Sequence, residues 1–246
     1  MIPADFVAEA KQASAANDSA KLKLLELEVE GLPWQREAAV LLATQVKPKP
    51  QTVDRLILFT GHRIDAPARG KPRFPASAEG AVKEAIRHMV SRQMGLADGA
   101  MLAVAGGANG GDILFLEVCR EMGVPIRMLL ALPPDQFIPA SVETESGGAW
   151  VERFKVLLEA GGGPVLAQDK TLPKWLAEKP GYDFWQRNNM WLIAYALARA
   201  PKHFVVAALW DGEEGDGPGG TGNMVATAQK NGAEFVWLDS QRIVGG

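Results

Sequence analysis

From residue 54 onward the sequence alternates between short apolar runs and amphipathic segments, and this alternation restricts the fold more than any other feature. The apolar runs predicted to be strands cover residues 56–59, 101–105, 126–132, 204–210 and 235–238. The predicted helices cover residues 77–93, 113–122, 150–160, 182–199 and 223–230. Strands that are apolar throughout and alternate with helices are typical of a parallel sheet covered on both faces. The sequence therefore predicts a Rossmann-like, doubly wound α/β domain with a mostly parallel sheet over residues 52–246.

Residues 1–51 have a different character, being rich in Ala, Lys, Glu and Leu. A helix is predicted to begin at residues 17–19 (Asn, Asp, Ser) and to end at residues 31–33 (Gly, Leu, Pro). A further helical stretch is predicted over residues 34–46, and Lys47-Pro48-Lys49-Pro50 predicts a stiff linker. We therefore expect a short helical arm of two or three helices, which could hold a second copy of the chain or another protein.

Composition narrows the class of protein. Apolar residues make up 47% and charged residues 22% of the 246, as in a folded protein with a core. No apolar run reaches 18 residues, and no basic and apolar leader opens the sequence, so a membrane protein is not expected. The one cysteine, Cys119, excludes an internal disulfide and a cysteine-built zinc site, which favours a cytoplasmic location.

The balance of charges argues against a nucleic acid as the partner. The formal net charge is −3, so no overall positive field would attract a polyanion. A DNA-binding function would instead require a local basic stripe that joins Arg63, Arg69, Lys71 and Arg73. We therefore expect a small-molecule ligand.

Glycine-rich turns follow three of the predicted strands, at the edge where ligands bind in doubly wound sheets. The first turn contains Gly61, which allows a ligand close to the backbone, and Arg63, which can pair with a phosphate. The second, residues 106–112, has four glycines in its first six positions, and the third covers residues 217–224. Both lead into a predicted helix, so exposed N–H groups and the helix dipole could together hold an anion. We expect these two loops to face each other across one crevice.

Polar and aromatic side chains beside these turns are further candidates. Asp112 could cap its helix or accept from a ribose hydroxyl, and the Thr221 hydroxyl could cap its helix or meet a phosphate oxygen. Arg187 and Asn188 place a cation beside an amide near a helix start. Trp185 could stack on a base or belong to the core.

The sequence predicts no metal site and no resident cofactor other than a nucleotide ligand. The acidic loop at residues 211–216 would repel a phosphate unless a divalent ion such as Mg²⁺ intervened, and it is more typical of a solvated loop. His62, His88 and His203 are too scattered to predict a metal cluster. The glycine loops match neither the dinucleotide GxGxxG pattern nor a Walker A loop, and no GxSxG, HExxH or CxxC motif occurs.

Together these loops resemble those of the SLOG superfamily, which groups the DNA-processing proteins and the lonely-guy phosphoribohydrolases. The resemblance runs from about residue 56 to 238 and rests on Thr60-Gly61-His62-Arg63, Gly106-Gly107-Ala108-Asn109-Gly110-Gly111-Asp112, Arg187-Asn188-Asn189-Met190, and Trp210-Asp211-Gly212 with Gly219-Gly220-Thr221-Gly222-Asn223-Met224. The Arg-Asn pair, followed by Asp-Gly and a Gly-Thr loop, is most similar to the YspA/YpsA-type branch.

The resemblance implies a Rossmann-like domain that binds a nucleotide or a nucleotide derivative at these loops. The phosphate contacts that it implies fall on Gly61, Gly106, Gly107, Gly110, Gly220 and Thr221. The full set of ligand-binding candidates adds Arg63, Asp112, Arg187, Asn188, Asp211 and Gly219.

The chain departs from the lonely-guy pattern PGGxGTxxE in its last glycine loop. Asn223 stands where that pattern has threonine, and Ala226 stands where it has the glutamate that helps to cleave the N-glycosidic bond. General acid–base help of this kind is worth roughly 10²–10⁴ in rate, so cleavage would need another carboxylate. Asp112, Asp183 and Asp211 are the candidates for that role.

Two functions are favoured at this point, ahead of a third, single-stranded DNA binding as in the DNA-processing proteins, which the net charge of −3 disfavours. A binding module would sense or hold a nucleotide-derived ligand, and the helical arm would relay the signal or dock a partner. A hydrolase or transferase would act on the N-glycosidic bond of a nucleotide, with Asp112 or Asp183 as the catalytic carboxylate. The paired phosphate loops, which come without a recognisable catalytic set, favour the binding module.

Overall fold

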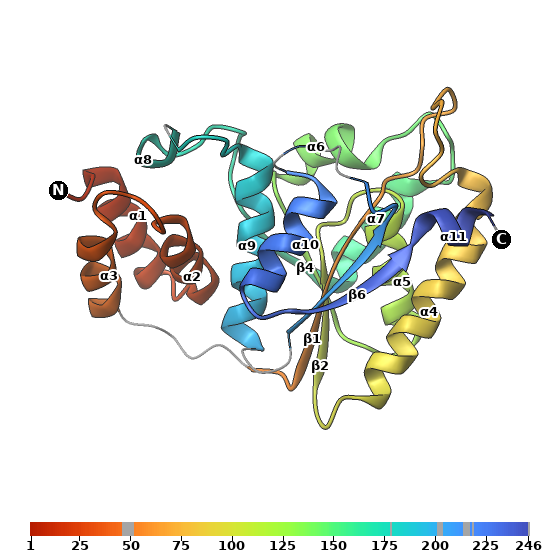
Figure 1. Cartoon of the computed structure of the whole chain (residues 1–246), viewed down its shortest axis with the longest axis horizontal. Helices are drawn as coiled ribbons and strands as arrows, with labels where there is room; N and C mark the ends of the chain where they lie inside the picture. The colour runs from red at the N-terminus through yellow and green to blue at the C-terminus, as the bar shows by residue number, and fades with distance from the viewer. Residues whose placement is uncertain (46–51, 178, 201–203, 214–216, 218, 246) are drawn as a thin grey trace.

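Within the described residues, six parallel strands form one sheet in the order β4-β3-β2-β1-β5-β6 (Figure 1). The computed structural model describes residues 1–45, 52–177, 179–200, 204–213, 217 and 219–245. The strands are β1 (Arg55–Gly61), β2 (Met101–Ala105), β3 (Ile126–Leu130), β4 (Gly162–Val165), β5 (Phe204–Trp210) and β6 (Glu234–Asp239). β5 lies beside β1 although it follows β4 in the chain, so the direction of winding reverses between β1 and β5. A doubly wound sheet binds its ligand outside the carboxyl ends of the strands at such a reversal.

Helices cover both faces of this sheet (Figure 1). One face carries α4 (Glu79–Gly95), α5 (Gly111–Glu121), α7 (Trp150–Gly161) and α11 (Ser240–Gly245), and the other carries α9 (Phe184–Arg199) and α10 (Thr221–Lys230). The connections contain η1 (Ala76–Ala78), α6 (Pro134–Phe137), η2 (Ile138–Val142) and α8 (Lys174–Ala177). Successive β1 residues point to opposite faces, so Ile57 and Phe59 pack in one buried cluster while Leu56 and Leu58 pack in the other. Burial on both faces explains why the strands are apolar throughout.

The arm consists of α1 (Ala4–Ala15), α2 (Ser19–Glu28) and α3 (Gln35–Thr44) and lies outside α9, on the side away from the sheet (Figure 1). α2 begins where predicted, because the Asp18 carboxylate accepts the Lys21 N–H at 2.8 Å. The arm has an apolar cluster of its own, which also includes Trp175, Leu176 and Tyr182 from the segment between β4 and α9. The buried apolar residues of the arm therefore contact this chain itself.

The predicted fold class is confirmed, and the sheet is parallel throughout the described residues. The sequence missed β4, because Gly162-Gly163-Pro164-Val165 has little strand propensity. This strand lies at an edge of the sheet, where proline is tolerated. The predicted linker at residues 47–50 and the acidic residues 214–216 lie outside the described residues. No described helix is both long and apolar enough to cross a membrane.

Candidate ligand cleft

A cleft of about 880 Å³ opens at the carboxyl ends of β1 and β2. Its walls are the turns after these two strands, the first turns of α9 and α10, and the segment that includes η2. Eight of the predicted ligand-binding residues line it: Gly61, Arg63, Gly106, Asp112, Asn188, Gly219, Gly220 and Thr221. Asp183 and Trp185 line it as well. The structure thus brings the second and third glycine-rich loops to one crevice.

The carboxyl group of Asp112 faces the glycine-rich loop after β2. Its Oδ2 accepts the Ala108 N–H at 3.3 Å, and the N–H groups of Gly107 and Gly106 also favour the charged form. Burial outweighs these hydrogen bonds and raises the pKa of Asp112 to about 7. The N–H groups of this loop are therefore directed at the chain's own carboxyl group, where the sequence predicted an external phosphate.

Because the pKa of Asp112 is raised in the folded protein, we expect the free energy of unfolding to decrease as the pH rises. In the folded chain the Asp112 carboxyl group keeps its proton up to about pH 7, whereas an aspartate in the unfolded chain loses its proton near pH 4. The stabilisation from this difference is therefore complete below about pH 4 and is lost as the pH rises through about 7. Between pH 5 and pH 8, the wild type should lose about 2 kcal/mol of unfolding free energy relative to Asp112→Asn. Urea unfolding of both proteins at the two pH values measures this difference. Parallel pH profiles would contradict the prediction.

An aspartate also closes the N-terminus of α9. Asp183 is the N-cap, and its carboxylate accepts the Gln186 N–H at 2.7 Å. A carboxylate in this position satisfies a free N–H group and compensates the positive end of the helix dipole. The helix end that faces the cleft here is thus already neutralised by the chain.

The N-terminus of α10 differs, because no described carboxylate closes it. α10 begins at Thr221, and its N-cap is Gly220. The prediction that Thr221 caps this helix is therefore wrong, because the cap lies one residue earlier. The first turn contains no acidic residue. The N–H groups of Thr221, Gly222 and Asn223 have no acceptor inside the helix, and the helix dipole adds a partial positive charge. These are the conditions under which a helix end binds an anion.

Two contacts with α9 position the loop that leads into α10. Asn189 Nδ2 donates to the Gly219 carbonyl at 2.8 Å. A Cβ at position 219 would lie 2.5 Å from the Cβ of Trp185, so only glycine fits. Trp185 also lines the cleft, and Lys170 Nζ lies 5.3 Å from the centre of its ring. Every nucleobase has a flat face that can stack on such a side chain.

Arg63 brings a positive charge to the cleft that no described carboxylate neutralises. Its guanidinium donates to the carbonyls of Ala140 at 3.2 Å and Glu143 at 3.4 Å. Burial lowers the pKa of Arg63, which remains far above neutrality as for any arginine. The carbonyls fix the position of the side chain without cancelling its charge, so Arg63 offers an anion one positive charge on a wall that Glu143 and Glu145 also line.

Asn188 supplies an unused hydrogen-bond acceptor. Its side chain lines the cleft and the residue is only 8% exposed. The Oδ1 atom is buried and has no hydrogen-bond partner within the described part of the chain. A buried polar atom without a partner is unfavourable by about 1–3 kcal/mol, and a ligand O–H or N–H would relieve this penalty only if neighbouring side chains moved to expose Oδ1.

Asn109 and Gly110 form a junction behind the cleft that the sequence analysis missed. Asn109 is 1% exposed; its Oδ1 accepts the Ile64 N–H at 3.0 Å, and its Nδ2 donates to the Val142 carbonyl at 3.1 Å. Gly110 has a φ of +83° and lies against the backbone of residues 62–64. An asparagine between pairs of glycines was the available signal, because such a residue can bridge loops with both ends of its amide.

Four predicted ligand-binding residues do not line the cleft: Gly107, Gly110, Arg187 and Asp211. Gly107 packs on Met128, whose sulfur would lie 2.8 Å from a Cβ at position 107. Arg187 points to the arm and pairs with two of its carboxylates. Each of these four residues shapes or supports the structure around the cleft.

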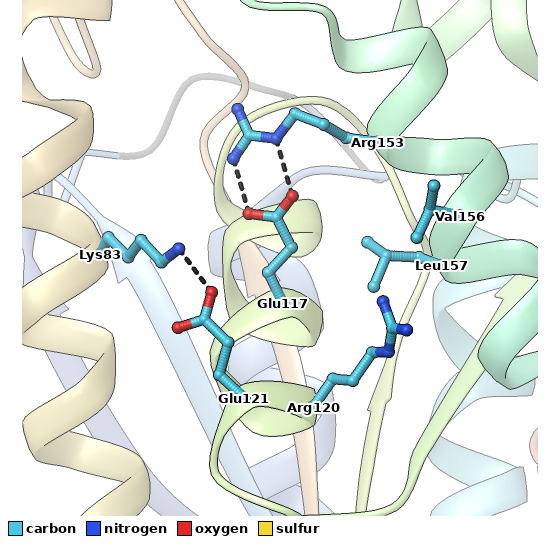
Figure 2. A pocket seen from close by; sticks show the side chains of 7 residues that line it. All are labelled: Lys83, Glu117, Arg120, Glu121, Arg153, Val156 and Leu157. Atoms are coloured by element: carbon cyan, nitrogen blue, oxygen red, sulfur yellow. Dashed lines mark hydrogen bonds and ion pairs between the residues drawn. The ribbon is translucent and has the colours of Figure 1, made fainter.

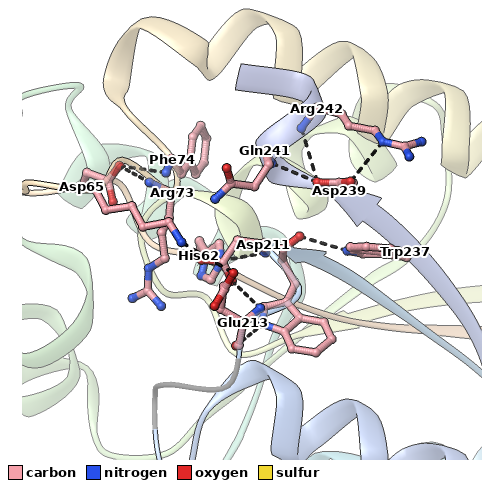
Figure 3. A network of polar contacts seen from close by, with 12 residues as sticks. His62, Asp65, Arg73, Phe74, Asp211, Glu213, Trp237, Asp239, Gln241 and Arg242 are labelled. Atoms are coloured by element: carbon pink, nitrogen blue, oxygen red, sulfur yellow. Dashed lines mark hydrogen bonds and ion pairs between the residues drawn. The ribbon is translucent and has the colours of Figure 1, made fainter. Parts of the chain in front are cut away.

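The side chain of Asp211 joins the ends of β1 and β5 (Figure 3). It is 3% exposed, and its Oδ1 lies 3.2 Å from His62 Nε2 and accepts the Glu213 N–H at 3.1 Å. The Asp211 N–H donates to the same His62 nitrogen at 3.0 Å. These contacts close the point where the winding reverses and leave Asp211 little surface for a ligand.

The basic residues that would form a DNA-binding stripe are interrupted by carboxylates. Arg63, Arg69 and Arg73 line the cleft, whereas Lys71 does not. Arg69 lies 3.3 Å from the Asp65 carboxylate, and Lys71 lies 3.5 Å from the carboxylate of Glu213. Asp65 also accepts the N–H groups of residues 73 and 74 (Figure 3). The structure therefore adds no support for a nucleic-acid partner.

A second hollow between α4, α5 and α7 is lined mainly by charges that neutralise one another (Figure 2). Arg153 donates to both carboxylate oxygens of Glu117 at 2.7 Å. Lys83 and Arg87 donate to the carboxylate of Glu121 at 2.7 and 2.6 Å. This hollow lies on the opposite face of the sheet from α9 and α10. Because its charges are mostly paired, it attracts an anion only weakly.

Within the described ranges, no three His, Cys, Asp or Glu side chains gather in an arrangement that could hold a metal ion.

Comparison of the chain with protein-family models and with curated proteins found no match.

Proposed function

We propose that this protein binds a nucleotide-derived small molecule in the cleft, with one phosphate group at the N-terminus of α10. The observation that carries the proposal is the difference between three helix ends that face the cleft. The carboxyl group of Asp112 lies in the first turn of α5 and that of Asp183 caps α9, whereas the end of α10 carries no described carboxylate. A second phosphate would approach the Asp183 carboxylate and be repelled, and the Asp112 carboxylate adds to this repulsion once it ionises above about pH 7. A nucleoside monophosphate is therefore the preferred class of ligand.

Three other cleft residues fit the same ligand. Arg63 adds a positive charge that favours an anion. Trp185 offers a flat apolar side chain for a base. Asn188 Oδ1 is a buried, unpartnered acceptor that a ribose hydroxyl or a base N–H would reach after a shift of neighbouring side chains. The resemblance to the SLOG superfamily points to the same class of ligand.

Calorimetric titration with AMP, ADP, ATP, cyclic AMP and adenosine tests the proposal. AMP should bind at least tenfold more tightly than ATP, and adenosine should bind weakly because it lacks the phosphate. The other nucleoside monophosphates test whether the base matters. Failure of every nucleotide to bind folded protein, or a preference for ATP over AMP, would count against the proposal.

A substitution that adds one charge tests the phosphate position. Asn223→Asp places a carboxylate in the first turn of α10, where it repels an anion while favouring the helix itself. The affinity for AMP should fall about 10- to 100-fold, equivalent to about 1.4–2.8 kcal/mol, with no loss of thermal stability. Gln12→Glu adds the same charge on an exposed position of α1 and should leave the affinity unchanged. Equal affinity in the two variants would place the phosphate elsewhere.

The raised pKa of Asp112 favours a second candidate, cleavage of the N-glycosidic bond. A carboxyl group that titrates near pH 7 can both donate and accept a proton at neutral pH. α10 itself contains no acidic residue, so it offers no replacement for the glutamate of the lonely-guy pattern. Release of free base from AMP that is abolished in Asp112→Asn, but retained in Asp183→Asn, would support this activity. Binding without release would leave the protein a binding module.

A further inference from the structure

A buried ionic cluster joins the arm to the start of α9. Glu28, the last residue of α2, is completely buried, and Arg187 is 4% exposed. Arg187 Nε donates to Glu28 Oε1 at 3.1 Å, and its Nη2 donates to Glu9 Oε1 at 2.7 Å. Tyr182 Oη donates to the same oxygen of Glu28 at 2.9 Å. One arginine of the α/β domain is thus held between two carboxylates of the arm.

The next two residues of α9 belong to the cleft. Asn188 lines it with an unpartnered Oδ1, and Asn189 holds the Gly219 carbonyl at 2.8 Å in the loop before α10. Arg187, Asn188 and Asn189 lie within one helical turn, which is a rigid unit. A displacement of this turn would move the arm contact and both cleft contacts together.

Apolar packing extends the arm contact along and beyond this turn. Ala20 and Leu24 of α2 belong to the buried cluster that includes Trp191 of α9. Trp175, from the segment before α9, makes edge-to-face contacts with Phe6 and Trp34 of the arm, at ring-centre distances of 5.0 and 5.9 Å. The arm therefore contacts the α/β domain on both sides of the Arg187 cluster.

We infer that the arm regulates the cleft: its docking on Arg187 sets the positions of Asn188 and Asn189, and its release weakens ligand binding. A buried arginine that loses both carboxylates is strongly destabilised, so Arg187 would turn toward water and the first turn of α9 would rearrange. Ligand binding and arm docking then favour each other, because coupling between two sites is reciprocal. Arg187, predicted as a ligand contact, is in this view a positioning residue.

Hydrogen exchange tests this coupling without any ligand. In Glu28→Gln, the hydrogen-bonded amides of residues 186–190, together with those of Gly220 and Met224, should exchange at least fivefold faster than in the wild type. Tyr182→Phe removes one hydrogen bond but keeps the ion pair, so it should give a smaller increase, about twofold, and it serves as the test if Glu28→Gln fails to fold. Glu37→Gln makes the same change on exposed α3 and should have no effect. Faster exchange confined to residues 1–45 would overturn the inference.

A second measurement rests on the proposed function. The affinity for AMP, measured by calorimetry, should fall at least threefold in Glu28→Gln and stay constant in Glu37→Gln. If the wild type does not bind AMP, the proposed function fails while the exchange experiment still decides the coupling. If AMP binds Glu28→Gln as tightly as the wild type although the arm exchanges faster, the coupling is refuted and the proposed function stands.

Discussion

Replacing Gly110 with alanine is expected to lower the free energy of unfolding by about 3–5 kcal/mol, the sum of backbone strain and a backbone clash. With φ +83° and ψ −124°, Gly110 has a backbone conformation that L residues rarely adopt, and the strain of an alanine there is about 1–3 kcal/mol. The added Cβ would also lie 2.8 Å from both the His62 carbonyl oxygen and the Ile64 nitrogen. Backbone atoms cannot turn away as a flexible side chain can, so the turns after β1 and β2 must separate.

Gly123→Ala is the matched control for this prediction. Gly123 has a similar φ of +76°, but nothing lies within 4 Å of a Cβ at that position. It should therefore show the strain alone, about 1 kcal/mol. Urea unfolding of both variants separates the two contributions. Equal losses in the two proteins would mean that the contact between the turns has no energetic importance.

Arg187→Ala is expected to destabilise the protein by about 3–5 kcal/mol, because it leaves a buried charge unpaired. Burial already raises the pKa of Glu28 above its ordinary value, although the charge of Arg187 opposes this rise. Without Arg187, Glu28 must take up a proton or the arm must undock. Thermal and urea unfolding at pH 7 measure the loss, and a smaller loss at pH 5 would show that protonation of Glu28 relieves it.

An exposed ion pair provides the control for Arg187. Lys230 lies 3.1 Å from Glu30, and both side chains are more than half exposed. Lys230→Ala should change the stability by less than about 1 kcal/mol, as is usual for surface pairs. Apolar substitution of both partners, Arg187→Met with Glu28→Leu, should restore most of the stability, because the remaining carboxylate, Glu9, keeps its ion pair with Lys21 at 2.8 Å. A double variant as unstable as Arg187→Ala would contradict this explanation.

Local patterns were sufficient to predict the doubly wound fold. A strand buried on both faces, such as β1 with its run Leu56-Ile57-Leu58-Phe59, is apolar at every position, so its sequence alone reveals its environment. β4 was missed because Gly162-Gly163 and Pro164 have no such signature and pair only at the edge. Here the neighbouring strand, not the local sequence, determines the structure.

The cleft shows where sequence reasoning reaches its limit. Arg187 and Asn188 are adjacent in the sequence, but successive helical residues point about 100° apart, and only the packing of α9 determines which one faces the cleft. Glu28 lies among alternating Lys, Leu and Glu residues and looks like part of a solvated face, yet it is fully buried. Asp112 faces a loop whose glycines were predicted to hold a phosphate. The orientation of the α9 side chains, the burial of Glu28 and the position of Asp112 all depend on contacts between segments that are distant in the sequence.

The junction at Asn109 has a consequence for the way a ligand would be received. Because one amide side chain ties the turn after β1 to the end of η2, one side of the cleft is preorganised. A ligand there would not have to order loose segments, so less of its contact energy would be offset by lost conformational entropy. Any tuning of affinity would then come from the opposite side, where α9 meets the arm.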